Sequence, residues 1–359
     1  MGRNALSIRA GGLGRSLLRS VALAVLMLAT GPGAAWRCVS TAVEPQGCAA
    51  TFTSTGKDPI DFTEHRAKLR AAFLYLPPRP LCQVTGPQGA ESQAVPKTFL
   101  DLTPDELAKE VPELKHLKFA NSQDMLPQIL ERVGAAVADF FDNFSNTTSA
   151  EHVLFTVESQ KLELPLHYEA MFDYLALAKP GTDKTRLQEY RTDSKGQQVN
   201  VRGTVATAGF VTLPAYFHPN YQRGSRFRYL GRDMVKGLSA YVVAFTQRPE
   251  VARQAGWVAF DDKAAYVFVQ GVAWIDPARF RILRLRTDIQ RPELSVGLQR
   301  ETTEVEYSEV TFKQGGKTLW LPHDVIVSGQ TNQYTFHNQH RYSDYRLFTV
   351  QTGEKDKNP

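Results

Sequence analysis

The sequence predicts a mainly β fold of the α+β class, built on a curved antiparallel sheet. Three observations predict it. Residues 151–350 alternate apolar and polar side chains with the period of two that half-buried strands show. Turn-forming pairs such as Pro180-Gly181 separate the alternating runs, without the long crossovers that parallel strands need. A helix with one apolar stripe precedes these runs, so we expect the sheet to curve around it.

Two of the predicted strands, 266–275 and 280–289, should form a hairpin. The segment 276–279 between them is short and polar and contains Pro277, which suits a tight turn. In the second strand, apolar residues occupy odd positions and charged residues occupy even ones. The apolar set is Leu283, Leu285 and Ile289, and the charged set is Arg284, Arg286 and Asp288. We expect the apolar set to face the core and the charged set to face water, because a one-residue slip would bury the charges.

The runs 302–312 and 318–328 carry the same period with one irregularity each. In the first, the apolar positions are odd up to Tyr307 and even from Val310 onward. This change of phase predicts a β-bulge near Ser308 and Glu309. In the second run, the odd positions are apolar except at His323.

Residues 101–148 form the predicted helical segment. Thr103, Pro104 and Glu106 combine the start signals of a helix, including a capping box. A longer helix should begin with Asp124 as its N-cap. Its apolar residues recur at spacings of three and four, and they are Leu126, Leu130, Val133, Val137, Phe140 and Phe141. We expect this stripe to pack against the apolar face of the sheet.

Residues 1–35 have the features of a secretory signal peptide. They contain four arginines and no acidic residue, then a short apolar run, a Gly-Pro-Gly break and Ala34-Ala35. We therefore expect export to the periplasm or the extracellular space, a mature chain starting near Trp36, and no membrane span. Most of the formal net charge of +5 belongs to this segment. The mature chain is thus close to neutral, which argues against nucleic-acid binding.

The three cysteines would then lie in an oxidising compartment. A disulfide between Cys38 and Cys48 would close the smallest loop, whereas Cys82 offers two other pairings, and the choice stays open. Bulky Arg37 directly precedes Cys38, where a lipidation site has a small residue. We therefore expect no acylation at Cys38. The rest of 36–100 is predicted to be a weakly structured extension with one short helix near 63–75, and 351–359 to be a flexible tail.

Several segments of residues 150–350 form a recognisable series. In order, they are 229–233, 241–243, 271–276, 281–285, 305–310, 321–322 and 342–348. They include a Gly-x-x-Trp-Ile-Asp strand, a Leu-Pro step and a terminal aromatic strand. This series resembles the periplasmic lipoprotein-carrier superfamily, the LolA/LolB-like proteins. The resemblance implies an open half-barrel wrapped around helices, with an apolar cavity for acyl chains. The long N-terminal extension departs from the carriers, and no ligand-contacting residue of the carriers matches one in this chain.

No sequence pattern indicates catalysis, a cofactor or a metal. The sequence contains no His-Glu-x-x-His, no Gly-x-Ser-x-Gly and no phosphate-binding loop. His337 and His340 are three residues apart, which in a strand puts their rings on opposite faces. A run of arginines is a candidate patch for an anionic partner, although a solvated strand face is the favoured interpretation. Its members are Arg279, Arg281, Arg284 and Arg286. We expect no enzyme activity.

Three hypotheses about function follow. The first is an exported binding protein that holds a lipid, an acyl chain or a lipidated partner in an apolar cavity. Each CH₂ group removed from water would contribute ~0.8 kcal/mol to such binding. The second is an envelope protein-interaction or sensor module whose sheet is filled by its own helices, and the third is a secreted hydrolase. For the first, the side chains expected to line the cavity are Phe268, Trp274, Leu283, Leu285 and Val325.

Overall fold

The computed structural model describes residues 51–54, 59–60, 97–159, 164–178, 187–199, 209–253, 256–260, 263–313 and 316–351. The predicted signal peptide, the short helix near 63–75, the three cysteines and nearly all of the predicted tail lie outside these residues. Within the described ranges, none of the helices combines the length and the apolar character that a membrane span requires.

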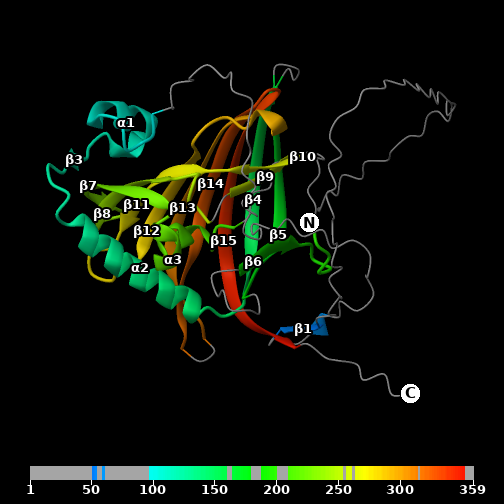
Figure 1. The fold of residues 1–359 in the computed structure, drawn as a ribbon. Helices are drawn as coiled ribbons and strands as arrows, with labels where there is room; N and C mark the ends of the chain where they lie inside the picture. Colours follow the sequence, from blue (N-terminus) through cyan, green and yellow to red (C-terminus); the bar gives the residue numbers. More distant parts are fainter. Residues whose placement is uncertain are drawn as a thin grey trace, which may run out of the picture. The chain divides into compact units, whose positions relative to one another are not determined.

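One large antiparallel sheet dominates the structure (Figure 1) and confirms the predicted mainly β class. Its strands lie in the order β3-β7-β8-β11-β12-β13-β14-β15-β4-β5-β6, and β1 and β2 extend it from β15. Among the described strands no pairing joins β3 to β6, so the sheet is open rather than a closed barrel. A separate two-stranded ribbon consists of β9 and β10.

The strands differ widely in length, and the longest are at the centre of the sheet. Their bounds are β1 (Thr51–Ser54), β2 (Pro59–Ile60), β3 (Lys118–Phe119), β4 (Thr147–Ser159), β5 (Leu166–Ala178), β6 (Leu187–Thr192), β7 (Ser225–Val235), β8 (Leu238–Gln247), β9 (Gly256–Phe260), β10 (Lys263–Val267), β11 (Val269–Ile275), β12 (Ile282–Ile289), β13 (Leu298–Thr311), β14 (Thr318–Thr331) and β15 (Tyr334–Gln351).

Short helices accompany the sheet. They are α1 (Pro104–Glu110), the 3-10 helix η1 (Pro112–Leu114), α2 (Leu126–Asp142), η2 (Leu213–Phe217), α3 (Pro219–Gln222) and η3 (Leu294–Val296). The predicted capping box starts α1, because the Thr103 N–H donates to the Glu106 carboxylate (2.9 Å) and the Glu106 N–H donates to the Thr103 hydroxyl (3.3 Å). The N-cap of α2 is Met125 rather than Asp124, and Pro127 lies in its first turn.

We call the face of the sheet that packs against α2 the inner face. Ile129, Val133 and Val137 of α2 are buried there, and Leu130 and Phe140 pack against the same apolar cluster. The predicted stripe is thus confirmed. The cluster also takes side chains from β5 and β6 at one end of the sheet and from β7 and β8 towards the other. Strands this far apart in the order reach one cluster because the sheet curves around it.

The opposite, outer face is covered over β7, β8, β11 and β12 by α1 and η1. Leu107 of α1 and Leu114 of η1 are buried in a second apolar cluster, together with Val242 and Trp274. The sheet therefore has an apolar layer on both faces in this region. Alternation in the sequence shows which residues share a face of the sheet. It does not show whether another segment of the chain covers that face or whether water does.

This cover overturns the expected exposure of Arg286. Its side chain is only 10% exposed, although the alternation predicts that it faces water. Arg286 donates to the Glu110 carbonyl at the end of α1 (3.0 Å), to Glu113 (3.1 Å) and to Asp288 (3.0 Å). Burial of this charge is tolerated because carboxylates and a carbonyl satisfy the guanidinium.

β11 and β12 form the predicted antiparallel hairpin. The register shifts between Trp274 and Ile275, which leaves Leu283 as an extra residue on β12. The expected facing is therefore wrong for Leu283, whose side chain joins the outer cluster. Leu285 is buried in the inner cluster, as predicted.

The irregularity predicted near Ser308 and Glu309 lies earlier in the strand. The pairing of β13 with β14 shifts between Glu306 and Tyr307, and the extra residue is His323 of the partner strand, which is exposed. The single polar residue among the apolar positions of that run is thus the sequence signal of the bulge.

Candidate functional site

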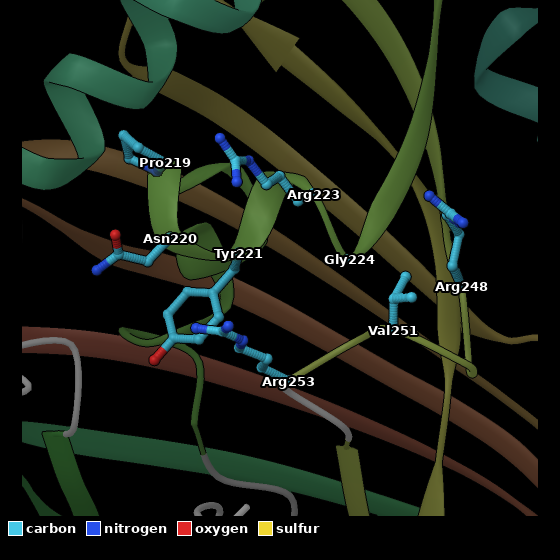
Figure 2. Close-up of a pocket in the computed structure, with 8 residues that line it drawn as sticks. All are labelled: Pro219, Asn220, Tyr221, Arg223, Gly224, Arg248, Val251 and Arg253. Atoms are coloured by element: carbon cyan, nitrogen blue, oxygen red, sulfur yellow. The ribbon is translucent and has the colours of Figure 1, made fainter.

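A cavity of about 610 Å³ lies where α3 leads into β7, beside the chain that leaves β8 (Figure 2). Its volume is in the range of small-molecule binding sites. The residues that line it come from these two segments and are Pro219, Asn220, Tyr221, Arg223, Gly224, Arg248, Val251 and Arg253. We call it the arginine cavity.

Backbone hydrogen bonds shape each wall of the arginine cavity, and one of them, between Arg248 and Gly224, joins the two walls. The Gly224 N–H donates to the Tyr221 carbonyl, and the Arg248 N–H donates to the Gly224 carbonyl, both at 2.8 Å. The Ala252 N–H donates to the Arg248 carbonyl (2.8 Å) and closes a turn after β8. A Cβ atom on Gly224 would lie 3.0 Å from the Ala252 Cα. Glycine at this position therefore lets the two walls approach closely.

Three arginines and no acidic residue line this cavity. Arg248 is partly engaged, because its Nε donates to the exposed carboxylate of Glu250 (3.0 Å). Arg223 and Arg253 are exposed, and among the described residues no carboxylate lies within 4.0 Å of either guanidinium. The cavity is therefore electropositive.

Tyr221 connects the arginine cavity to the apolar interior. Its ring is partly buried and packs against the inner cluster. The neighbouring Gln222 donates from Nε2 to the Leu130 carbonyl of α2 and to the Phe217 carbonyl of η2, both at 2.8 Å. A Cβ on Gly134 of α2 would lie 3.3 Å from that Phe217 oxygen, so the helices pack closely. The cavity thus adjoins the helices that fill the inner face.

A second hollow, of about 570 Å³, differs in its charges. Its charged lining residues have both signs and are Lys109, Arg286 and Arg300 against Glu110, Glu158, Asp288 and Glu301. Arg286 and Asp288 already form an ion pair at 3.0 Å. Because its charges compensate one another, this hollow attracts a charged ligand less than the arginine cavity does.

The inner face also buries a charged cluster that joins β4, β6 and β15. Arg191 donates from Nε to Glu151 (2.5 Å), His340 Nδ1 lies 2.9 Å from the same carboxylate, and the Tyr342 hydroxyl donates to it (2.6 Å). Burial alone would raise the pKa of Glu151, but the Arg191 charge and these hydrogen bonds outweigh burial and hold the pKa at about 2. Burial lowers the pKa of His340 more than Glu151 raises it. The hydrogen bonds of Glu151 thus link three strands, whereas His340 Nε2 is buried without a hydrogen-bond partner among the described residues.

Glu189 fastens the segment that leads into η2. Its carboxylate accepts hydrogen bonds from the Tyr174 hydroxyl (2.5 Å) and from the backbone N–H groups of Val211 (3.0 Å) and Thr212 (2.9 Å). Burial raises the pKa of Glu189, and these hydrogen bonds oppose the rise. The segment that leads into η2, which packs against the inner face, is thus hydrogen-bonded to β6.

The five side chains expected to line a ligand cavity lie in three places. Leu285 and Val325 are buried in the inner cluster, and Trp274 and Leu283 are buried in the outer cluster. Phe268 is partly buried between β10 and β11. These four side chains therefore form two pairs, one on each face of the sheet, and do not share one cavity. Their role as a cavity lining stays a prediction.

The run of arginines predicted as a candidate patch is compensated by carboxylates. Arg279 and Arg281 both donate to Glu309, at 2.8 and 2.9 Å, and Arg284 donates to Glu304 (2.6 Å). The arginines of the cavity were missed by sequence reasoning. Arg248 and Arg253 are close in the chain but Arg223 is not, and the three follow no shared pattern, so the pairing of β7 with β8 is what brings Arg223 to the other two.

His337 and His340 lie on opposite faces of β15, as predicted. The ring of His340 is buried beside Glu151. His337 Nδ1 lies 2.8 Å from the Ser328 hydroxyl, and its Nε2 lies 3.2 Å from Gln339. The two rings therefore do not share a site.

Comparison with known proteins finds likeness at the level of solved structures. No family model matches the chain, and no curated protein matches it. The chain is similar to a DUF1329 family protein from Desulfovibrio piger, at 11% identity with a TM-score of 0.31, covering 62% of this chain and 93% of that one. It is also similar to a protein described as an outer membrane lipoprotein-sorting protein domain, from Vibrio parahaemolyticus, at 13% identity with a TM-score of 0.30, covering 63% and 94%. A LolA superfamily protein from Nitrosomonas europaea is similar at 14% identity with a TM-score of 0.28, covering 62% and 92%. At this level of similarity, function has to be argued from the residues of the chain itself.

Proposed function

We propose that this chain is a non-enzymatic binding protein of the cell envelope, which holds an acyl chain or a lipidated partner against the inner face of its sheet. The open sheet supports the proposal, because its inner face is apolar and is covered by helices rather than by further strands. The expected signal peptide would bring the protein to the compartment in which such ligands need a carrier.

The observation that carries the proposal is the contact between the arginine cavity and the inner cluster at Tyr221. α3 lies between the two and is held to α2 by side-chain packing and by the Gln222 amide. In this proposal α3 moves away from α2 when a ligand enters, and the ligand then contacts the apolar side chains of the inner cluster. An acyl chain entering there would gain ~0.8 kcal/mol for each CH₂ removed from water.

A second function, an envelope protein-interaction or sensor module, is favoured by one observation. The apolar stripe of α2 and the side chains of η2 fill the inner face in the described part of the chain. In this alternative the filled sheet is a rigid body that presents its surface to a partner protein, and no acyl chain enters.

Native mass spectrometry of the full chain, purified from its own cell envelope, distinguishes the two functions. We expect a co-purifying mass that organic extraction removes and that fragments as a lipid or an acyl chain. A clean mass of the protein alone would favour the interaction module.

A fluorescent fatty acid provides the matched test in solution. The Tyr221→Ser variant should weaken its binding about ten-fold, because the change removes apolar contact where the cavity meets the inner cluster. The control is Met234→Ser, on the part of β7 that is remote from the cavity, where the side chain is 60% exposed. Equal binding by both variants and by the unchanged protein would contradict entry beside Tyr221.

A further inference from the structure

We propose that the arginine cavity is a recognition site for the phosphate headgroup of the acylated ligand, with Arg223 and Arg253 as its principal contacts. The inference rests on the proposed function and names the polar end of its ligand. It assigns the apolar end to the inner cluster, which Tyr221 joins to the cavity.

The positive charge of the cavity indicates an anionic ligand. Among the described residues Arg223 and Arg253 have no carboxylate within 4.0 Å, and Arg248 is paired with the exposed Glu250, so the lining carries excess positive charge that favours an anion. The outer face shows the contrasting case, in which Arg284 and Arg286 are surrounded by Glu113, Glu304 and Asp288. No acidic residue is among those that line the arginine cavity.

The charged residues of the cavity are arginines, which suit a phosphate group. A guanidinium group presents parallel N–H donors whose spacing matches the oxygens of a phosphate, so it can bind a phosphate bidentately. Arg223 and Arg253 come from the two segments that form the cavity (Figure 2). In Figure 2 Arg223 extends towards Pro219 and Arg253 extends towards the Tyr221 ring. Both side chains are exposed, and both would turn to donate to one phosphate bound between the segments. Arg248 already donates to Glu250 and would add mainly positive charge.

The size and position of the cavity indicate that the ligand also has an apolar part. A volume of about 610 Å³ exceeds the needs of a phosphate group alone, and one wall, at Tyr221, leads to the apolar cluster. The buried Glu189 is already paired with the backbone N–H groups of Val211 and Thr212, which precede η2. A ligand with one anionic end and one apolar end therefore fits the site better than a free anion does.

Competition between three probes tests the inference on the full exported chain. The probes are 1-oleoyl lysophosphatidic acid, 1-monooleoylglycerol with the same acyl chain but no phosphate, and glycerol 3-phosphate with no acyl chain. The two acylated probes are used below the concentrations at which they aggregate. We expect lysophosphatidic acid to bind at least about ten-fold more tightly than monooleoylglycerol. This preference should weaken as the salt concentration rises.

The R223Q/R253Q variant should lose that preference while it keeps the affinity for monooleoylglycerol. The R223K/R253K variant, which keeps the charge but not the planar donors, should keep part of the preference. The matched control is R279Q/R281Q, which removes the same number of charges from a pair that is compensated by Glu309. It should bind all probes as the unchanged protein does. Because Arg223 and Arg253 are exposed, we expect the thermal unfolding of their variants to stay unchanged.

Different negative results would overturn the headgroup inference and the proposed acyl-binding function. Equal binding of lysophosphatidic acid and monooleoylglycerol would overturn the headgroup inference and leave the proposed function in place. A preference that survives in R223Q/R253Q would overturn the assignment to this cavity. Binding of glycerol 3-phosphate as tight as that of lysophosphatidic acid would support a phosphate site and overturn the acyl ligand. Absence of binding by all three probes would overturn both proposals.

Discussion

Glu301 of β13 carries a carboxyl group in surroundings that disfavour its charge. Burial raises the pKa of Glu301 to about 7. The carboxylate also acts on Tyr216 of η2, whose hydroxyl pKa is raised first by burial and then by Glu301. The stability of the fold should therefore depend on pH through Glu301.

The sign of this coupling follows from proton linkage. The folded protein holds the Glu301 proton more tightly than the unfolded chain, in which the pKa is close to 4.5. The free energy of unfolding should thus fall as the pH rises from about 4.5 to about 7. Glu301→Gln should remove this loss and stabilise the protein by roughly 1–3 kcal/mol at pH 8, with little effect at pH 4. Denaturant unfolding at both pH values measures it. The exposed Glu309→Gln is the control, and an equal effect of both variants would contradict the prediction.

Arg191 and Glu151 form a pair in which each charge depends on the other. Arg191→Met should lower the free energy of unfolding by about 3–5 kcal/mol, because it leaves the Glu151 carboxylate buried without its main partner. The double variant E151Q/R191M should recover part of that loss, since it removes the stranded charge as well. Urea unfolding of R191M, E151Q and the double variant measures the difference. If the double variant is as unstable as the sum of the single variants, the two residues act independently.

The low pKa of Glu151 gives the opposite pH dependence to that of Glu301. Its ionised form stabilises the fold at pH values above the unfolded value near 4.5, and this contribution is lost as the pH falls towards about 2.

Helix α2 is the element on which the filling of the inner face depends. Val137→Asp should lower the free energy of unfolding by about 3–5 kcal/mol and unfold a marginally stable domain, because it buries an unpaired carboxylate. The control is Ala135→Asp on the exposed side of the same helix, which should cost about 1 kcal/mol or less through helix propensity alone. Circular dichroism during thermal unfolding compares the two, and equal melting temperatures would contradict the packing of α2 against the sheet.

The hairpin of β11 and β12 shows what strand patterns do and do not reveal. Its pairing was predictable, because two alternating runs flank a short turn that contains proline. The bulge at Leu283 was not, because an extra residue on one strand changes the facing of its neighbours without changing their apolar character. The cover of Arg286 by α1 depends on a segment far away in the chain, and no local pattern records it.

The whole chain carries one further prediction, about its export. We expect the mature protein to start near Trp36 and to carry no fatty chain at Cys38, because Arg37 directly precedes the cysteine and Ala34-Ala35 form a small-residue exit. Intact-mass measurement of the exported protein compares this expectation with the alternatives. A mass that includes two or three acyl chains at the N-terminus would contradict it.

The sequence by itself determined the mainly β class, the antiparallel hairpins, the capping box of α1 and the burial of the α2 stripe. Each of these depends on residues close together in the chain, where periodicity and turn chemistry are sufficient. The tertiary structure alone decided that the outer face is covered, that Leu283 and Leu285 point to opposite faces, and that Arg223, Arg248 and Arg253 share one cavity. The cover of the outer face arises because a distant segment packs on the sheet. The other two features arise from the bulge and the pairing of consecutive strands, which set facing and proximity without leaving a pattern in the side chains themselves.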